Sequence, residues 1–191
     1  FLVQWAAVES ADTLFVACNG TDNPTDVIMT VGYAQRDDKP HALSVASSMQ
    51  TALDNKGGRA ETTVDRISAL VRGSGKPKVV LCGHSLGGGY AILAALDMIH
   101  RGLPITSVLT FGAPQVVVPD PANSTWQKLN AIAVLYVNAW DIVPRLPSCD
   151  AWLNDVLPSA ALSENRRLAT AAKVLGYDLS GKIAHMLETL G

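Results

Sequence analysis

Charged side chains are scarce in this sequence, and no run of like charge occurs along it. Lys and Arg total 15, Asp and Glu total 17, and together they make up 17% of the residues, with a formal net charge of -2. A nucleic-acid-binding surface needs clustered basic side chains to pair with phosphates. Nucleic acid is therefore not an expected partner. The 48% of hydrophobic residues is ample for a core, which excludes intrinsic disorder.

Cysteine is also scarce. The three cysteines are Cys18, Cys82 and Cys149, and the first two lie in apolar strand-like runs. An odd number in such positions excludes a disulfide framework and predicts buried free thiols. No spaced cluster of His, Cys and carboxylate residues suggests a metal site. We expect neither a metal nor another cofactor.

No hydrophobic run is long and uninterrupted enough to span a membrane. The two longest uncharged stretches examined are residues 79–96 and 103–119. The first contains a histidine and three consecutive glycines, and the second contains three prolines, whereas a span needs about 20 apolar residues in one helix. We expect no transmembrane segment. The chain begins at Phe1 without a signal-like region, which is typical of a mature or trimmed product.

Strand-like and helix-like patterns alternate along the chain. Apolar, β-branched runs predict strands, and apolar residues three or four apart predict helices. The predicted strands are 13–18, 78–82, 105–111 and 131–137, and the predicted helices are 44–53, 59–71, 90–100, 165–175 and a short one at 126–130. This alternation predicts an α/β fold with a mainly parallel sheet. The length of 191 residues favours one domain over 1–191.

One motif carries chemistry: residues 83–87 read GHSLG and fit the G-x-S-x-G pattern of a nucleophile elbow. A predicted strand precedes the motif and a predicted helix follows it, which is the setting that the motif requires. The start of a helix also offers free N–H groups and the positive end of a dipole for a developing oxyanion. The motif predicts Ser85 as a nucleophile.

A serine hydroxyl needs a base, normally histidine, to become a good nucleophile. In this fold the chain order is serine, acid, histidine. Of the four histidines, His41, His84, His100 and His185, only His185 follows both Ser85 and a strand-end acid. We therefore expect His185 to be the base.

The acid is predicted from its place after a strand. Asp141 follows the strand 131–137 and precedes a Val-Pro pair, so it is expected at the carboxyl edge of the sheet, where catalytic groups gather. Asp155 and Asp178 stay as alternatives.

Three segments together resemble the class 3 lipase family of α/β-hydrolases. They are residues 80–88 (VLCGHSLGG), 110–114 (TFGAP) and 141–147 (DIVPRLP), in the order and at the spacing of that family. The resemblance implies an α/β-hydrolase fold, with a mainly parallel central sheet and helices on both faces.

The resemblance also implies site residues. It gives Ser85, Asp141 and His185 as the catalytic triad, Thr21 as an oxyanion-hole residue, and the backbone N–H of Leu86 as the second donor. No metal enters this site.

The activity implied by the resemblance is that of a lipase or carboxylesterase acting on acylglycerols. A phospholipase, a feruloyl-type esterase or an acyltransferase would use the same triad, and a catalytically silent lipid-binding protein would keep the fold. The family also suggests a secreted monomer with transient contact to a lipid interface. The apolar triplet Val27, Ile28 and Met29, soon after Thr21, lies where the family places a mobile cover; it is either part of such a lid or an ordinary strand or satellite-core element.

Overall fold

The computed structural model describes residues 2–21, 35–38, 41–138, 141 and 143–145. The chain divides into two units, Phe1–Pro147 and Ser148–Gly191, and the described residues all lie in the first. One domain over 1–191 therefore stays a prediction. The apolar triplet 27–29, a candidate lid, and the expected helix 165–175 lie outside the described residues.

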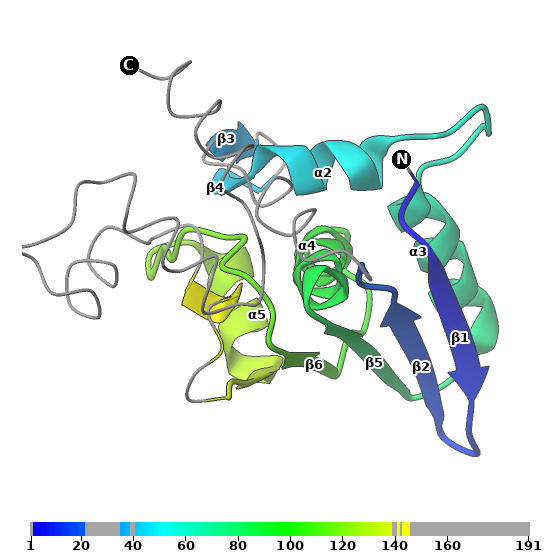
Figure 1. Ribbon diagram of the computed structural model, residues 1–191. Helices are drawn as coiled ribbons and strands as arrows, with labels where there is room; N and C mark the ends of the chain where they lie inside the picture. Colours follow the sequence, from blue (N-terminus) through cyan, green and yellow to red (C-terminus); the bar gives the residue numbers. More distant parts are fainter. Residues whose placement is uncertain (1, 22–34, 39–40, 139–140, 142, 146–191) are drawn as a thin grey trace, which may run out of the picture. The chain divides into compact units, whose positions relative to one another are not determined.

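A five-stranded sheet forms the centre of the first unit (Figure 1). Its strands, in spatial order, are β1 (Trp5–Glu9), β2 (Thr13–Cys18), β5 (Lys78–His84), β6 (Ser107–Phe111) and β7 (Ala133–Tyr136). β1 is antiparallel to β2, and the other neighbouring pairs are parallel. This order confirms the predicted α/β class and the mainly parallel sheet.

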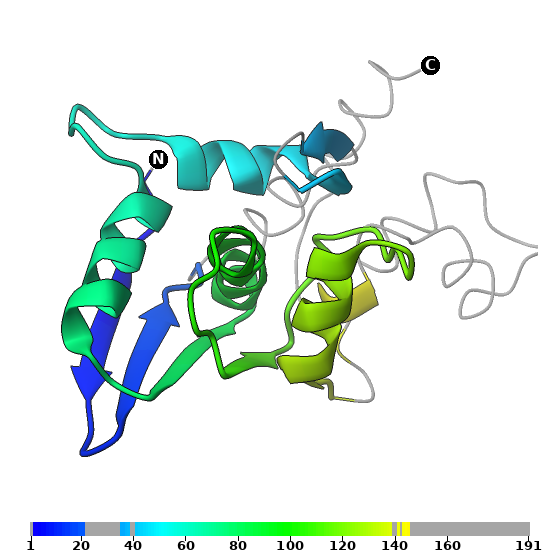
Figure 2. The same cartoon turned by 180° about the vertical axis from the view of Figure 1, so that it is seen from behind.

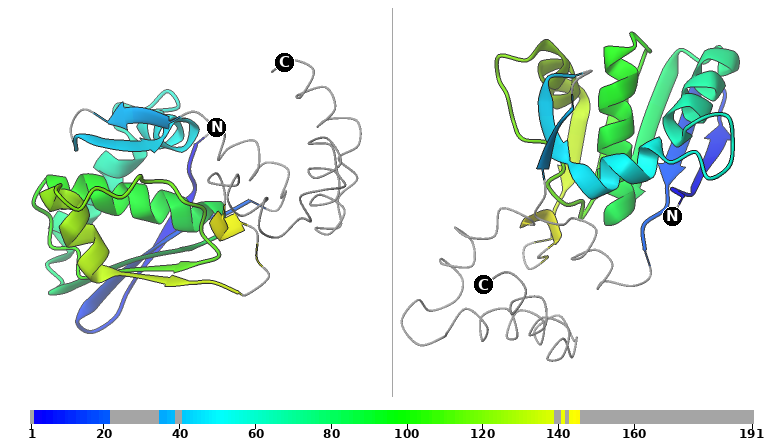
Figure 3. Two further views of the ribbon diagram at one scale, coloured as in Figure 1. Left: turned by 90° about the vertical axis from the view of Figure 1, so that its left-hand side faces the viewer. Right: turned by 90° about the horizontal axis from the view of Figure 1, so that it is seen from above.

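In the described part of the chain, four helices accompany the sheet: α2 (Ser47–Asp54), α3 (Thr63–Ser74), α4 (Leu86–His100) and α5 (Ser124–Ile132), with a 3₁₀ turn, η1, at Val143–Arg145. α4 contacts β2, β5 and β6, and α2 packs on its outer side. Seen from the side, the sheet, α4 and α2 form successive layers (Figure 3, left), and the view from behind agrees (Figure 2). Every residue from 86 to 98 is buried, as expected of a helix that is apolar nearly all round.

A two-stranded hairpin replaces the first turn of one predicted helix. β3 (Gln35–Asp38) and β4 (Leu43–Ala46) pair antiparallel, and Val45 of β4 also bridges to Val117. The prediction of a helix over 44–53 is therefore wrong before Ser47, where α2 begins. Val45, Met49 and Leu53 do share helical spacing, but pairing with two other segments holds Val45 in a strand.

The two faces of the central sheet differ. Leu14, Val16, Leu81 and Val108 are 0% exposed and form the face under the helices, since side chains alternate along a strand. The other face carries residues such as Phe111 and is partly exposed in the described part of the chain. Helices on that second face stay a prediction, because the described helices pack on the first (Figure 3, left).

No helix among the described residues is both long and apolar enough to cross a membrane.

The start of α3 is fixed by side chains. The Thr62 hydroxyl accepts a hydrogen bond from the Asp65 N–H at 3.1 Å, and the Asp65 carboxylate accepts one from the Thr62 N–H at 3.1 Å, a reciprocal capping box. Asp65 also accepts a hydrogen bond from Arg101, just after α4, at 2.7 Å. The hydrogen bond from Arg101 is the main reason that the pKa of Asp65 falls to about 2, with a smaller contribution from Thr62.

Replacing Asp65 by Asn is expected to lower the thermal stability of the protein at pH 7 and to lower it less at acidic pH. Because the folded-state pKa of Asp65 lies below its ordinary value of 3.8, its contribution is present above about pH 4 and is lost as the pH falls toward 2. The pair is half-exposed, so we expect Tm to fall by only about 1–3 °C at pH 7. Thermal unfolding from pH 7 to pH 2.5 measures the difference. Glu61→Gln, at an exposed position, is the control, and a pH-independent difference for Asp65→Asn would contradict the account.

Candidate active site

Ser85 occupies the turn between β5 and α4. It follows the last residue of β5, and its φ of 54° and ψ of -129° lie where side chains are rarely tolerated. Its N–H donates a hydrogen bond to the carbonyl of Phe111 at 2.9 Å, which ties the turn to the end of β6. The residue is only 7% exposed. The motif thus stands in the strand, tight turn and helix setting that its sequence predicts.

Two glycines of the motif permit this turn to pack closely. A Cβ built on Gly83 would overlap the carbonyl group of Gly87, and one built on Gly87 would overlap the carbonyl oxygen of Cys18 in β2. These obstacles are backbone atoms, so no side chain can swing away to make room. Both positions therefore require glycine.

The segment after β2 lies beside Ser85. A Cβ built on Gly20 would be 3.7 Å from the Cβ of Ser85 and 2.7 Å from the carbonyl oxygen of His84. Thr21 follows directly and is half-buried. Leu86 is the first residue of α4, where backbone N–H groups have no acceptor within the helix. The structure thus brings the segment that carries the predicted oxyanion residue Thr21 to the turn that holds Ser85 and Leu86.

Asp141 lies beside the end of β6. Its Oδ1 accepts a hydrogen bond from the Val143 N–H at 3.0 Å, and its own N–H donates to the carbonyl of Asn138 at 3.0 Å, so a tight turn after β7 holds it. Its Oδ2 lies 2.5 Å from the point where Gly112 would carry a Cβ. The carboxylate therefore reaches back from the β7 turn to the residue that follows Phe111. His185, the predicted base, lies outside the described residues.

Gly112 is a residue that the sequence patterns did not single out as part of the site. Its φ is +60°, and its N–H donates to the carbonyl of Tyr136 at 2.9 Å. The sequence could have indicated Gly112, because it is the glycine that directly follows the predicted strand 105–111, in the segment TFGAP. Its missing side chain makes room for Asp141.

Replacing Gly112 by Ala is therefore expected to reduce the ester hydrolysis that the sequence resemblance implies. The new Cβ would displace the Asp141 carboxylate, and a displacement of about 1 Å in a catalytic group can cost about 10²-fold in rate. The measurement is kcat for a soluble ester, with Tm recorded alongside. Gly75→Ala is the matched control, because Gly75 has a φ of +61° but no atom within 4 Å of its Cβ position. An equal loss of kcat in both variants would mean that strain, not Asp141, is responsible.

Two thiols near the motif do not compete with Ser85. Burial raises the pKa of Cys18 to about 12, with a smaller effect from Cys82, and burial also raises the pKa of Cys82. A neutral thiol is a poor nucleophile. Both are free cysteines, Cys18 buried and Cys82 half-buried, in line with the prediction of free thiols. Among the residues that the structure describes, no group of His, Cys, Asp and Glu could hold a metal ion.

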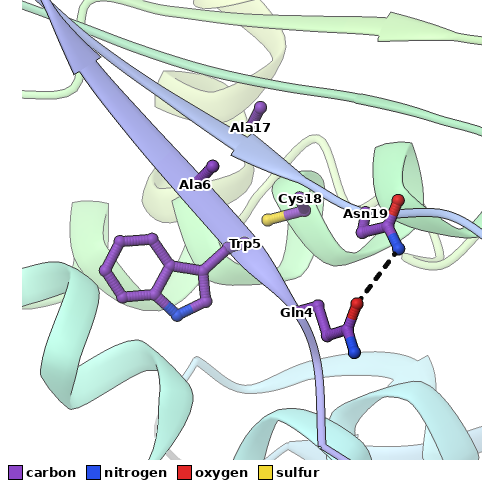
Figure 4. A pocket seen from close by; sticks show the side chains of 6 residues that line it. All are labelled: Gln4, Trp5, Ala6, Ala17, Cys18 and Asn19. Atoms are coloured by element: carbon purple, nitrogen blue, oxygen red, sulfur yellow. Dashed lines mark hydrogen bonds between the residues drawn. The ribbon is translucent and has the colours of Figure 1, made fainter.

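A pocket of about 350 Å³ opens at the start of β1 and the end of β2 (Figure 4). The Asn19 amide donates a hydrogen bond to the Gln4 side-chain oxygen at 3.4 Å across its rim. The pocket is lined by Gln4, Trp5, Ala6, Ala17, Cys18 and Asn19, and the last of these directly precedes Gly20 in the chain. These side chains include no candidate for acid, base or nucleophile at neutral pH, since burial raises the pKa of Cys18.

Known proteins resemble this chain in sequence over one part and in fold over a larger part. A phospholipase A1-IIdelta of Arabidopsis thaliana is 38% identical over 77 residues, which are 38% of this chain and 18% of that protein. A lipase of Rhizomucor miehei is 41% identical over 73 residues, 37% of this chain and 20% of that protein. The matched part thus spans about a fifth of these curated relatives.

The fold has counterparts among solved fungal lipases. Lipase II from Rhizopus niveus superposes with a TM-score of 0.63 at 24% identity, over 77% of this chain and 57% of that one. At this level of identity the likeness supports the fold alone. The model of the lipase (class 3) family, in contrast, matches residues 15–151, which is more than half of the chain. The protein therefore belongs to the class 3 lipase family of ester hydrolases.

Proposed function

We propose that this protein is a serine ester hydrolase that cleaves acylglycerols through an acyl-enzyme on Ser85. The observation that carries the proposal is the left-handed backbone of Ser85 between β5 and α4, at a position where glycine would be free of strain. Strain of this kind persists where the surroundings impose it, and it clusters at active sites. Membership of the class 3 lipase family supports the same reaction class.

The proposed reaction has two steps. The Ser85 hydroxyl attacks the ester carbonyl carbon while His185 takes its proton, and the tetrahedral intermediate expels the alcohol, which receives that proton. Water then attacks the acyl-enzyme, again with His185 as base, and releases the fatty acid and the free serine. Asp141 holds the imidazole in the required tautomer and balances its charge. The turn that fixes Asp141 through Val143 and Asn138 suits this orienting role.

The oxyanion of the intermediate would be held at the start of α4. We assign the backbone N–H of Leu86 and the residue Thr21 as donors, since Gly20 packs against the Ser85 turn. Donors fixed before the reaction cost no reorganisation as negative charge develops, and losing one typically slows turnover by about 10²–10³-fold. The helix dipole of α4 adds to their effect.

Phospholipid is the second candidate substrate, because one relative is a phospholipase A1 at 38% identity. An acyltransferase would use the same acyl-enzyme with an alcohol in place of water. A secreted monomer in transient contact with a lipid interface completes the proposal.

The substrate class is tested by direct comparison. We expect the purified protein to hydrolyse p-nitrophenyl esters in a chain-length series, and to release fatty acid from emulsified triacylglycerol faster than from phosphatidylcholine. Faster release from phosphatidylcholine would favour the phospholipase. No release from any ester, together with binding of lipid, would favour a catalytically silent lipid-binding protein.

A further inference from the structure

We propose that Gln115 is a positioning residue for the acid of the site, because it ties the turn that carries Asp141 to the segment that follows β6. The inference rests on the proposed function and adds a residue outside the triad and the oxyanion hole. The contacts involved lie within the described part of the first unit.

The backbone on both sides of Gln115 is held in place. Pro114 and Val116 are buried, and the carbonyl of Val116 accepts a hydrogen bond from the N–H of Ala46, in β4, at 2.9 Å. A Cβ built on Gly89 of α4 would come within 3.0 Å of Cγ1 of Val116, so this segment also packs closely against that helix. The Gln115 side chain itself is exposed. It extends from a fixed backbone and fills no space in the core.

A hydrogen bond joins this segment to the turn that carries Asp141. The side-chain amide of Gln115 donates to the carbonyl of Pro144, in η1, at 3.1 Å. The preceding residue, Val143, donates its N–H to Oδ1 of Asp141 at 3.0 Å. Because both hydrogen bonds involve η1, a displacement of this turn would also move the donor that orients the Asp141 carboxylate.

The segment 112–115 meets the Asp141 turn at two points. Oδ2 of Asp141 lies 2.5 Å from the point where Gly112 would carry a Cβ, and Gln115 holds η1 from the other end of the same segment. Pro114 stands between the two contacts, and its ring fixes its φ. This limits how far one contact can shift relative to the other. The short segment after β6 therefore sets the place of the carboxylate.

The size of the expected effect is that of one hydrogen bond. The bond holds η1 in the reacting arrangement, and the net contribution of a single hydrogen bond corresponds to about a 3- to 10-fold change in rate. A carboxylate that is out of place orients the catalytic base poorly, whereas the ester binds as before. We therefore expect the loss of the Gln115 amide to lower kcat and to leave KM nearly unchanged.

The test is kcat and KM for p-nitrophenyl butyrate in Gln115→Met, which keeps the length of the side chain but has no N–H donor. We expect kcat to fall by about 3- to 10-fold and KM to stay within about twofold. Because the side chain is exposed, Tm should stay within about 2 °C of the wild type. Gln115→Arg, which again offers N–H donors, should recover about half or more of the wild-type kcat. Gln115→Leu gives the same measurement if the methionine variant folds poorly.

Gln127→Met is the matched control. Gln127 is likewise an exposed glutamine whose side-chain amide donates to a prolyl carbonyl, that of Pro121, at 2.7 Å. It lies in α5, and this bond joins no residue of the proposed site. Its kcat should stay within about 1.5-fold of the wild type. An equal loss in both variants would mean a general effect of removing a surface hydrogen bond, and the inference would be wrong.

A double-mutant cycle with Asp141 separates positioning from a merely structural role. Asp141→Asn keeps a side-chain oxygen that can accept the Val143 N–H but removes the negative charge. Adding Gln115→Met to this variant should lower kcat by less than about 1.5-fold, because the acid that Gln115 positions has already lost its function. A loss as large as in the wild-type background, or a rise in KM in place of the loss in kcat, overturns the role of Gln115.

The remaining outcomes separate this inference from the proposed function. An unchanged kcat in Gln115→Met, with hydrolysis that still depends on Ser85, overturns the role of Gln115 alone. Hydrolysis that does not depend on Ser85, or that Asp141→Asn leaves at the wild-type level, overturns the proposed reaction, and this inference with it.

Discussion

Replacing Ser85 by Ala should lower ester hydrolysis by about 10⁴–10⁶-fold in kcat and leave the fold intact, because the proposed reaction begins at this hydroxyl. The loss should not destabilise the protein. The Ser85 side chain makes no capping hydrogen bond at the start of α4, and alanine keeps the Cβ that the turn already accommodates. The measurement is turnover of p-nitrophenyl butyrate, with Tm expected within about 2 °C of the wild type.

Ser124→Ala is the control for this variant, since Ser124 is an exposed serine that likewise stands at the start of a helix. It should keep full activity. Turnover near the wild-type level in Ser85→Ala would show that another group performs the attack.

Replacing His185 by Ala should lower kcat by about 10³–10⁵-fold, because the Ser85 hydroxyl would lose the base that takes its proton. Members of a triad act as a unit, so the double variant Ser85→Ala, His185→Ala should be no slower than Ser85→Ala alone. The rates are measured with the same soluble ester. Added imidazole should partly restore turnover in His185→Ala but not in the double variant.

His100→Ala is the control for this second variant, because the residue follows the nucleophile in the chain but precedes every strand-end acid. A double variant much slower than either single one would show that the two residues contribute independently. Full activity in His185→Ala would place the base elsewhere in the chain.

The strands were predictable where local sequence and tertiary pairing agree. The run TLFVAC, closed by Asn19 and Gly20, becomes β2 with the predicted bounds. The edge strand β1 was missed, because its sequence WAAVE has little β-branched character and pairing with β2 holds it in place.

The start of α4 shows how packing overrides propensity. The apolar pattern predicts a helix over 90–100, whereas α4 begins at Leu86 and runs through three glycines that favour turns. A Cβ on Gly88 would approach that of Ala113 to 2.6 Å, and one on Gly89 would approach Cε of Met49 to 2.6 Å. Glycine at these two positions lets distant segments pack closely against α4, and no local sequence pattern reveals such contacts.

The candidate site divides in the same way. Ser85 could be predicted from a local sequence motif, and the structure places that motif between a strand and a helix, as predicted. The approach of the Asp141 carboxylate to Gly112 joins residues far apart in sequence, and it depends on the positive φ of Gly112 and on the turn after β7. The sequence indicated Asp141 as a strand-end acid but gave no sign that its carboxylate would lie against Gly112.

The central claim is that Ser85 is the nucleophile, and labelling with a fluorophosphonate tests it most directly. The probe forms a stable bond with a serine that a neighbouring base activates, and peptide mapping by mass spectrometry locates the adduct. We predict one adduct per chain, on Ser85, formed in step with the loss of esterase activity and absent from the Ser85→Ala variant. Loss of activity with the adduct on another residue, or hydrolysis that continues without any adduct, would contradict the account.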